Sequence, residues 1–320
     1  MLRRRIYVTC PLPPSVKVLL SDGCDVTFAG EERVPTAEEI VSGTLGHDAL
    51  LVTTPTRVDR PLIERLPPSV KAIATYSVGN DHIDVDAAAE HGLAVFSTPD
   101  VLTDACAEAT MLLMLGAARR ATEAIALLRE GRWQGWTPVQ LNGVGLTGKR
   151  LGIVGMGRLG RAIADRARAF GMAVDYHNRS RLEPGLEAGA GYHASLEDLL
   201  RVSQFLVLAC PATEQTRGLL NARRIGLLPP GAIVVNIGRG SVVVDDDLIA
   251  ALGDGRVAGA GLDVFDGEPS VHPGYFRLPN VFMLPHVGSA TIETREAMGQ
   301  ILLDGLRDFW AGRPAVNRLV

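Results

Sequence analysis

The chain has 320 residues, 47% of them hydrophobic, so it can bury two cores, and its length favours two domains. A formal net charge of −4 argues against nucleic acid or an anionic membrane surface as a partner. No apolar run approaches the length of a membrane span or a signal-peptide core, and the four cysteines show no Cys-x-x-Cys spacing. These features predict a cytoplasmic protein whose cysteines stay reduced.

Short apolar runs alternate with helix-like segments along most of the chain, which predicts an α/β fold built on parallel sheets. In the first hundred residues we expect strands at Ile6–Cys10, Val26–Phe28, Ala49–Thr53, Lys71–Tyr76 and Ala94–Ser97. The expected helices between them include Ser15–Leu20, Ala37–Val41 and Asp84–His91. This alternation is typical of a doubly wound, Rossmann-like domain.

A long apolar helix is predicted from about Asp100 to Glu130, ended by Gly131. Further strands are expected to start at Leu151, Ala173, Phe205, Ala232, Gly259 and Val281, and a last helix at Ser289–Ala311. Because this helix is long enough to return to the first domain, we expect two Rossmann-like, doubly wound parallel-sheet domains, one inserted into the other. The expected outer domain comprises residues 1–99 and 288–320, and the inserted domain residues 100–287.

The inserted domain contains a dinucleotide-binding pattern. The strand Leu151–Val154 leads directly into Gly155-Met156-Gly157-Arg158-Leu159-Gly160, and helical spacing continues to Phe170. The glycines allow a tight turn, a close backbone approach to a pyrophosphate and close packing of helix on strand, while the helix N-terminus offers free N–H groups. The predicted cofactor contacts in this turn are Gly155, Gly157, Arg158, Leu159 and Gly160.

A second copy of the glycine pattern, Gly143-Val144-Gly145-Leu146-Thr147-Gly148, precedes a strand instead of following one. The bare pattern is weak without a strand before it and a helix after it. We therefore interpret this copy as a connecting loop.

The turn after the second strand of the unit predicts which dinucleotide binds. The strand Ala173–His177 ends at Asn178-Arg179-Ser180-Arg181, where an NAD site usually carries an Asp or Glu for the ribose 2′-hydroxyl. Here the carboxylate is absent, and two guanidinium groups flank a serine. Such groups suit a 2′-phosphate, so we expect NADP(H), with NAD(H) bound more weakly. The alternative is that the two arginines are an ordinary solvated pair.

Three polar residues follow predicted strands, at the sheet edge where open α/β folds place their ligands: Arg239, Glu268 and His286. Hydride transfer to a ketone builds charge on the carbonyl oxygen, so a proton donor such as histidine is needed. A neighbouring carboxylate favours the charged imidazole, and an arginine fork can hold a 2-ketoacid. Each residue alone is more often structural, and sequence spacing does not show that the three converge. The seven histidines offer no metal-ligand spacing, so no metal is expected.

The chain resembles the D-2-hydroxyacid dehydrogenase family over nearly its whole length. Besides the Gly155 pattern, the resemblance rests on Ser77-Val78-Gly79-Asn80-Asp81-His82-Ile83-Asp84, Asn236-Ile237-Gly238-Arg239-Gly240 and Leu284-Pro285-His286-Val287-Gly288-Ser289-Ala290-Thr291. It implies that His286 is the general acid and base, that Glu268 tunes it, and that Arg239 binds substrate. The backbone N–H groups at Val78 and Gly79 would contact the substrate carboxylate. We interpret His82 as scaffolding of that loop, because it lies outside the matched trio.

The resemblance assigns further contacts. Asp263 would lie near the nicotinamide amide, and Cys210-Pro211 would form the turn beside the adenosine, although plain core packing is as good an interpretation of Cys210. The other implied cofactor contacts are Thr216, Ile237, Gly238, Arg239, His286 and Gly288. Ser289 is implied as a substrate contact.

Within the family the chain is similar to the NADPH-dependent glyoxylate/hydroxypyruvate reductases, through Trp133-Gln134-Gly135-Trp136-Thr137-Pro138, the His286 motif and the arginine-bearing turn. That branch implies reduction of small 2-ketoacids to D-2-hydroxyacids, and a homodimer in which Trp136 reaches the partner's active site. The tryptophans could instead only pack the dimer arm. 2-Ketogluconate reductases share much of this pattern. A dinucleotide-sensing, non-catalytic binding protein is a further alternative that the composition does not favour.

Overall fold

The computed structural model describes residues 3–30 and 33–320, and the chain divides into two compact units. One unit comprises Met1–Leu102 with Ala290–Val320, and the other comprises Thr103–Ser289. Within the described residues, no helix has the length and apolar character needed to cross a membrane.

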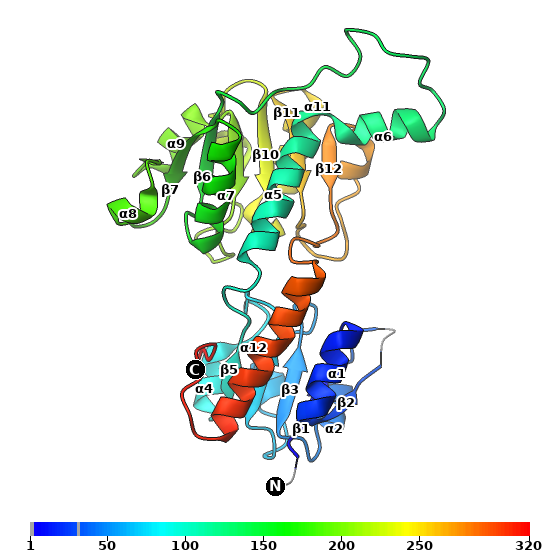
Figure 1. Cartoon of the computed structure of the whole chain (residues 1–320), viewed down its shortest axis with the longest axis vertical. Coiled ribbons are helices and arrows are strands. Elements are labelled where there is room, and N and C mark those ends of the chain that lie inside the picture. The colour runs from blue at the N-terminus through cyan, green and yellow to red at the C-terminus, as the bar shows by residue number, and fades with distance from the viewer. Residues whose placement is uncertain (1–2, 31–32) are drawn as a thin grey trace. The chain divides into compact units, whose positions relative to one another are not determined.

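The first unit is built on a five-stranded parallel sheet with the strand order β2-β1-β3-β4-β5 (Figure 1). Its strands are β1 (Arg5–Val8), β2 (Asp25–Phe28), β3 (Ala49–Val52), β4 (Ala72–Thr75) and β5 (Ala94–Phe96). Every residue of β3, β4 and β5 is buried and all but Thr75 are apolar, as expected of a parallel sheet covered on both faces. The order 2-1-3-4-5 is a doubly wound topology.

Helices cover both faces of this sheet. On one face lie α1 (Pro14–Gly23) and α12 (Ile292–Trp310), and on the other α2 (Ala37–Gly43), α3 (Arg60–Ile63) and α4 (Val85–Glu90). A Cβ on Gly299 would lie 2.7 Å from Cγ1 of Val16, so a glycine there lets α12 pack closely on α1. The C-terminal helix is thereby part of the same core as the first strands.

The second unit contains a seven-stranded parallel sheet with the order β12-β11-β10-β9-β6-β7-β8. The strands are β6 (Arg150–Val154), β7 (Ala173–His177), β8 (Gly191–Tyr192), β9 (Phe205–Leu208), β10 (Ala232–Asn236), β11 (Val257–Leu262) and β12 (Val281–Met283). Chain order reverses between β6 and β9, and such a switch point is where doubly wound sheets bind dinucleotides.

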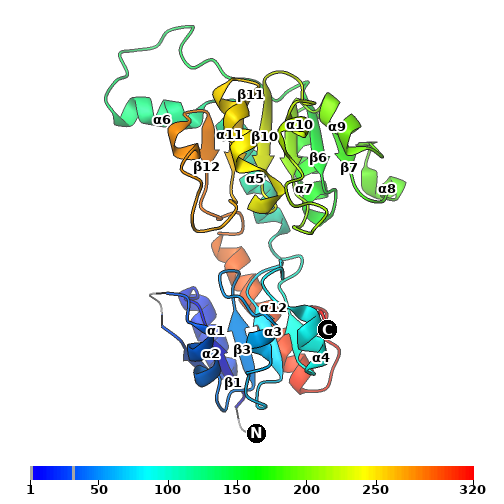
Figure 2. The same ribbon diagram turned by 180° about the vertical axis from the view of Figure 1, so that it is seen from behind.

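Five helices enclose the seven-stranded sheet. One face is covered by α5 (Thr103–Ala118) and α7 (Arg158–Ala169), visible in Figure 1, and their apolar residues form one core with the strands. The other face, seen in Figure 2, carries α9 (Leu196–Val202), α10 (Ala222–Ile225) and α11 (Asp245–Gly253). The two predicted doubly wound parallel sheets are both present.

The predicted helix over 100–130 is wrong as a single helix. The structure has α5 up to Ala118 and a separate α6 (Ala121–Arg129), with Arg120 in the left-handed region at φ 54°. The Ala118 carbonyl accepts a hydrogen bond from the N–H of Val144 at 2.8 Å, and so the connecting loop supplies a partner for an end of α5. A Cβ on Gly143 would lie 2.2 Å from that carbonyl oxygen, which explains the glycine in the loop.

Several short elements were not among the sequence expectations. They are the edge strand β8, α3, α8 (Pro184–Glu187), α9, α10, α11 and two 3-10 turns at Gly240–Val242 and Tyr275–Arg277. Segments this short carry too few turns for a helical period to stand out.

Candidate active site

The carboxyl edge of the seven-stranded sheet gathers most of the predicted site residues. The glycine-rich turn follows β6, the Asn178–Arg181 turn follows β7, and Cys210 follows β9. Arg239 comes after β10, Asp263 directly after β11, and His286 after β12. Because all strands are parallel, these segments share one edge of a single domain.

Two of the three glycines after β6 are required by the fold, and one is not. Gly155 has φ +100°, and a Cβ there would lie 2.8 Å from the Cys210 nitrogen. A Cβ on Gly160 would lie 2.3 Å from the Gly155 oxygen. By contrast, a Cβ on Gly157 would meet no described atom within 4 Å. Since Gly157 also precedes α7 without a side-chain cap, this turn leaves room and N–H donors for a pyrophosphate.

Cys210 lies between two of these strand ends. A Cβ on Gly238 would lie 2.7 Å from the Cys210 carbonyl oxygen, and a Cβ on Gly155 would crowd the Cys210 nitrogen. Only glycines at these two positions leave room for the Cys210 backbone to pack between them. The Cys210 side chain is 8% exposed within the core, and burial raises its pKa to about 11. The Cys210 thiol is therefore a packing group. The backbone of Cys210 packs against the turns that follow β6 and β10.

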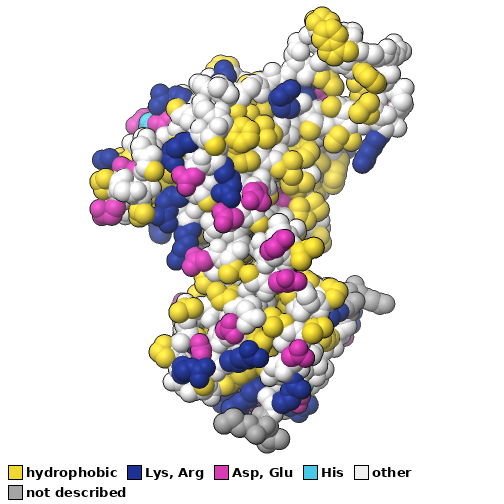
Figure 3. Space-filling model, in the orientation of Figure 1, with side chains coloured by type: hydrophobic (Ala, Val, Ile, Leu, Met, Phe, Trp, Pro, Cys, Tyr) yellow, Lys and Arg dark blue, Asp and Glu magenta, His cyan; other side chains and the backbone are white. Residues whose placement is uncertain are grey.

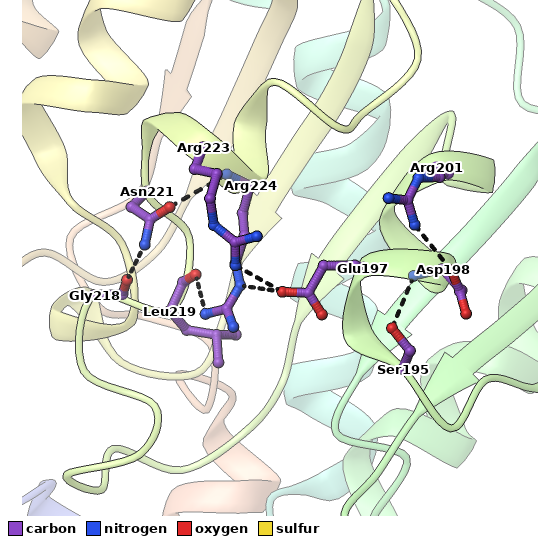
Figure 4. Close-up of polar contacts among 9 residues, drawn as sticks. All are labelled: Ser195, Glu197, Asp198, Arg201, Gly218, Leu219, Asn221, Arg223 and Arg224. Atoms are coloured by element: carbon purple, nitrogen blue, oxygen red, sulfur yellow. Dashed lines mark hydrogen bonds and ion pairs between the residues drawn. The ribbon is translucent and has the colours of Figure 1, made fainter.

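The loop that follows Cys210 and Pro211 is held by hydrogen bonds at its start and by ion pairs just after its end. The hydroxyl of Thr216 donates to the Pro211 carbonyl at 2.7 Å. Farther along, Glu197 of α9 accepts hydrogen bonds from Arg223 at 2.8 Å and Arg224 at 3.2 Å (Figure 4). The backbone at Glu197 and then these two guanidinium groups lower its pKa to about 2. This ion cluster holds the start of α10 against α9.

Two side chains of the turn after β7 form hydrogen bonds with other parts of the unit. Asn178 accepts a hydrogen bond from the Met156 N–H at 2.6 Å, so its side chain fastens the glycine-rich turn. Arg181 donates to both carboxylate oxygens of Glu187, at 2.8 and 3.0 Å. Arg179 and Ser180 are exposed, and Arg179 makes no hydrogen bond or ion pair with another described residue. The two arginines of this turn are thus not equivalent.

His286 and Glu268 are in direct contact. The Nδ1 atom of His286 lies 2.7 Å from Oε2 of Glu268, and Oε1 of Glu268 accepts from the Phe265 N–H at 2.8 Å. Burial alone would raise the pKa of Glu268, but the hydrogen bonds from His286 and from Phe265 lower it overall. The carboxylate therefore stays ionised and holds Nδ1. The His286 side chain is 39% exposed, so Nε2 remains for a substrate.

The segment around His286 is held by Asp263. This carboxylate, 1% exposed, accepts from the N–H groups of Val287 at 2.8 Å and Gly288 at 2.9 Å. Burial raises the pKa of Asp263, although both N–H groups oppose that change. His286 itself has φ 54°, a left-handed conformation that is costly for a histidine. Asp263 thus stabilises a strained backbone at the candidate proton donor.

Asn236 is a residue that the motif analysis quoted but did not assign to the site. It is 1% exposed, donates from Nδ2 to the Arg239 carbonyl at 2.9 Å and accepts from the Gly238 N–H at 3.1 Å. A Cβ on Gly240 would lie 1.8 Å from the Phe265 carbonyl carbon. This contact draws the Arg239 turn against the segment that carries Glu268. A buried Asn at a strand end was the only signal for this role.

In the first unit, Val78 and Gly79 follow β4 at the carboxyl edge of its sheet. Ser77 donates to the Gly79 carbonyl at 2.7 Å, Thr75 lies 2.7 Å from Ser77, and Nε2 of His82 lies 2.9 Å from Thr75. The N–H groups of Val78 and Gly79 donate to no backbone carbonyl of the described residues. The binding of a substrate carboxylate by this loop stays a prediction, as does the role of the partly buried Ser289.

An apolar surface lies on α6 and on the loop that follows it, visible as yellow side chains on the projecting segment of Figure 3. We call this segment, residues 121–142, the arm. Trp136 is 81% exposed, and none of the residues of α6 is buried. The other large exposed apolar side chains of the arm are Ile125, Leu128, Trp133 and Val139. Large apolar side chains gathered on one exposed segment often mark an interface.

Comparison with known proteins identifies the family. The model for the D-isomer specific 2-hydroxyacid dehydrogenase NAD binding domain matches residues 111–288, more than half of the chain. A glycerate dehydrogenase from Hyphomicrobium methylovorum is 43% identical over 300 residues, covering 93% of each chain. A glyoxylate reductase from Thermococcus kodakarensis is 41% identical, covering 97% of this chain and 94% of its own. The chain therefore belongs to the D-isomer specific 2-hydroxyacid dehydrogenases and is an NAD(P)-dependent oxidoreductase.

A solved structure agrees with this assignment. It is an NADPH-dependent glyoxylate/hydroxypyruvate reductase from Sinorhizobium meliloti in complex with NADP and malonate. The TM-score is 0.89 at 34% identity, over 99% of this chain and 97% of that one. The resemblance inferred from the four motifs is confirmed at the level of family and fold.

Proposed function

We propose that this protein reduces small 2-ketoacids, glyoxylate and hydroxypyruvate, to D-2-hydroxyacids with NADPH. The observation that carries the proposal is the 2.7 Å contact between His286 and an ionised Glu268 at the carboxyl edge of the dinucleotide-type sheet. Relatives named glyoxylate reductase and glycerate dehydrogenase support the substrate class. Residues 100–287 would bind the cofactor, and residues 1–99 with 288–320 would form the substrate domain.

The catalytic roles follow from the contacts at this edge. Bound nicotinamide supplies the hydride. Glu268 holds Nδ1 of His286 and favours the charged ring, so Nε2 can give a proton to the carbonyl oxygen as negative charge develops there. The Arg239 guanidinium would hold the ketoacid carboxylate by paired, charge-assisted hydrogen bonds. In the reverse direction His286 would accept the proton from the 2-hydroxyl group.

The residues after β6 and β7 support a dinucleotide with a 2′-phosphate. Gly157 leaves space beside the uncapped start of α7, which suits the pyrophosphate. Asn178 stands where a carboxylate would bind a ribose 2′-hydroxyl, and Arg179 with Ser180 is exposed at the same turn. NAD(H) would bind more weakly because it lacks the phosphate.

The test is a comparison of kcat/KM for NADPH and NADH with glyoxylate and hydroxypyruvate. We expect a higher kcat/KM with NADPH, and Arg179→Ala should raise the KM for NADPH much more than the KM for NADH. Equal values for the two cofactors would contradict the cofactor assignment while leaving the ketoacid reduction intact. Absence of turnover with a panel of 2-ketoacids would favour the dinucleotide-sensing alternative, and a preference for 2-ketogluconate would favour the second candidate substrate.

A homodimer is part of this proposal. The arm exposes Leu128, Trp133 and Trp136, and burying such side chains against a second copy would stabilise a dimer. By analogy with the reductase branch, Trp136 would enter the partner's active site.

A further inference from the structure

We infer that Glu187 is a positioning residue for cofactor selection: it holds Arg181 so that the free edge of the guanidinium meets the 2′-phosphate of NADP(H). This inference rests on the cofactor preference proposed above and assigns a new residue to it. Glu187 lies at the end of α8, six residues after Arg181, and nothing in its sequence surroundings pointed to a functional role.

The contacts with Glu187 determine which edge of the Arg181 guanidinium is left for a ligand. Nε and Nη2 of Arg181 donate to Oε1 and Oε2 of Glu187, at 2.8 and 3.0 Å. The Arg181 guanidinium also lies 5.8 Å from the ring centroid of Tyr192. A guanidinium has five N–H donors, and this side-on pairing uses two of them. The outer edge, formed by Nη1 and the second hydrogen of Nη2, is the edge that matches a phosphate.

The carboxylate of Glu187 is itself held from the core. Oε1 accepts a hydrogen bond from the Tyr176 hydroxyl at 2.6 Å, and Tyr176 is completely buried in β7. The same hydroxyl accepts from the Leu182 N–H at 3.0 Å, next to Arg181 in the chain. The Glu187 side chain is 8% exposed, whereas the Arg181 side chain is 63% exposed. The buried Glu187 carboxylate is thus fixed by the core, and it holds the accessible Arg181 guanidinium in place.

Because only one of the two arginines is paired with Glu187, Arg181 and Arg179 would contribute to phosphate binding in different ways. The hydrogen bonds with Arg181 and Tyr176 lower the pKa of Glu187 to about 2, so the carboxylate stays charged at neutral pH. Arg181 and Glu187 together carry no net charge, and they contribute directed donors. Arg179, which has no ion-pair partner among the described residues, contributes the net positive charge. A preorganised donor loses less freedom on binding, which favours affinity.

Binding of adenosine fragments to the whole protein tests the inference without catalysis. The probes are 2′,5′-ADP, which carries the 2′-phosphate, and 5′-AMP, which lacks it, measured by isothermal titration calorimetry. Glu187→Gln should weaken 2′,5′-ADP about tenfold, the value of one charge-assisted hydrogen bond, and change 5′-AMP less than about twofold. The matched control is Glu183→Gln, which removes an exposed charge from the same segment and should change neither affinity by more than about twofold.

A double-mutant cycle guards against a general loosening of α8. In an Arg181→Ala background, Glu187→Gln should have no further effect on 2′,5′-ADP binding, because the group it positions is gone. Equal loss of both ligands in Glu187→Gln, an unchanged 2′,5′-ADP affinity, or tighter 2′,5′-ADP binding would each overturn the positioning role. If the wild-type protein itself binds 2′,5′-ADP no better than 5′-AMP, the proposed cofactor preference fails, and this inference fails with it.

Discussion

His286 combines a strained backbone with a side chain anchored on one side only. Its Nδ1 is engaged by Glu268, its N–H donates to the Asp263 carbonyl at 2.8 Å, and its φ is 54°. Strain of this kind persists only where the surroundings stabilise it, and it is common at sites of chemistry. The geometry therefore favours His286 over His82, whose ring contacts Thr75 in the scaffold of the Val78–Gly79 loop.

We expect His286→Ala to lower kcat for ketoacid reduction by roughly 10²–10⁴-fold, the usual contribution of a general acid, with little change in NADPH affinity. His286→Asn should behave alike, and it guards against misfolding because Asn tolerates a left-handed backbone. Steady-state kinetics and a fluorescence titration of NADPH measure the two effects. His272→Ala, which alters a histidine paired with the exposed Asp246, is the control. Retention of wild-type kcat in either His286 variant would refute the assignment.

Glu268→Gln should change the pH dependence of reduction. Reduction consumes a proton from the imidazole, so its rate falls as pH rises and the ring loses its charge. Glu268 is ionised at neutral pH, since its pKa is lowered, and its negative charge favours the protonated ring. A neutral amide removes that stabilisation, so the fall in kcat/KM should begin at a lower pH. An identical pH–rate profile in the variant would mean that the contact has no catalytic role.

At the scale of elements, the close contact between the connecting loop and the end of α5 depends on one glycine. Gly143→Ala would place a Cβ 2.2 Å from the Ala118 carbonyl oxygen, which belongs to the backbone and cannot rotate away. We expect a loss of roughly 1–3 kcal/mol in the free energy of unfolding, as for other overpacked sites. Gly145→Ala is the control, because a Cβ there meets no described atom within 4 Å. Urea denaturation measures both variants, and equal effects would show that the contact is relieved cheaply.

The ion pairs between Glu197 of α9 and the arginines of α10 predict that the thermal stability of the protein depends on pH. The pKa of Glu197 is lowered to about 2 by its backbone contact and by Arg223 and Arg224. A depressed pKa stabilises the fold above the unfolded value, roughly 4.3, and this stabilisation is lost as the pH falls towards the folded value. Glu197→Gln should therefore lower the Tm at pH 7, and the difference from wild type should shrink below about pH 4.3.

Helix α9 also offers a control, in a separate ion pair. Arg201→Gln breaks the pair between Arg201 and Asp198, whose side chains are 55% and 63% exposed. The pair is drawn apart from the Glu197 contacts in Figure 4. Exposed pairs contribute little, so the Tm should barely change. A Tm difference for Glu197→Gln that is constant from pH 7 down to pH 3 would show that the effect is packing and not charge.

At the scale of the whole molecule, the arm is notable because its large apolar side chains are not covered by the rest of the unit to which it belongs. Trp136, at 81% exposure, offers an apolar face and one N–H donor. If it lines a partner's active site, Trp136→Ala should alter the ratio of kcat/KM between hydroxypyruvate and a bulkier ketoacid while sedimentation still reports a dimer. Val316→Ala, at another exposed apolar position, serves as the control. A constant ratio, or a monomeric variant, would leave Trp136 as interface packing.

Local patterns in the chain were enough for the class of fold and for the family. Buried parallel strands are short apolar runs, and the observed bounds of β1 to β5 lie within two residues of the expected ones. The Gly155 turn was recognisable because a strand precedes it and a helix follows it, which is also a local property. Placing Arg239, Glu268 and His286 after strands required only the knowledge that parallel strands end at one edge.

The contacts that join these elements were decided by the tertiary structure. His286 meets Glu268 across 18 residues, and Val144 reaches Ala118 across 26 residues, because of how neighbouring strands and loops pack. The same packing turns Glu187 towards Arg181, so that of the two arginines flanking Ser180 only Arg181 is paired with a carboxylate among the described residues. Helical and strand periods report which face of an element is apolar. They carry no information on which partner fills that face, and so the pairings could not be read from the sequence alone.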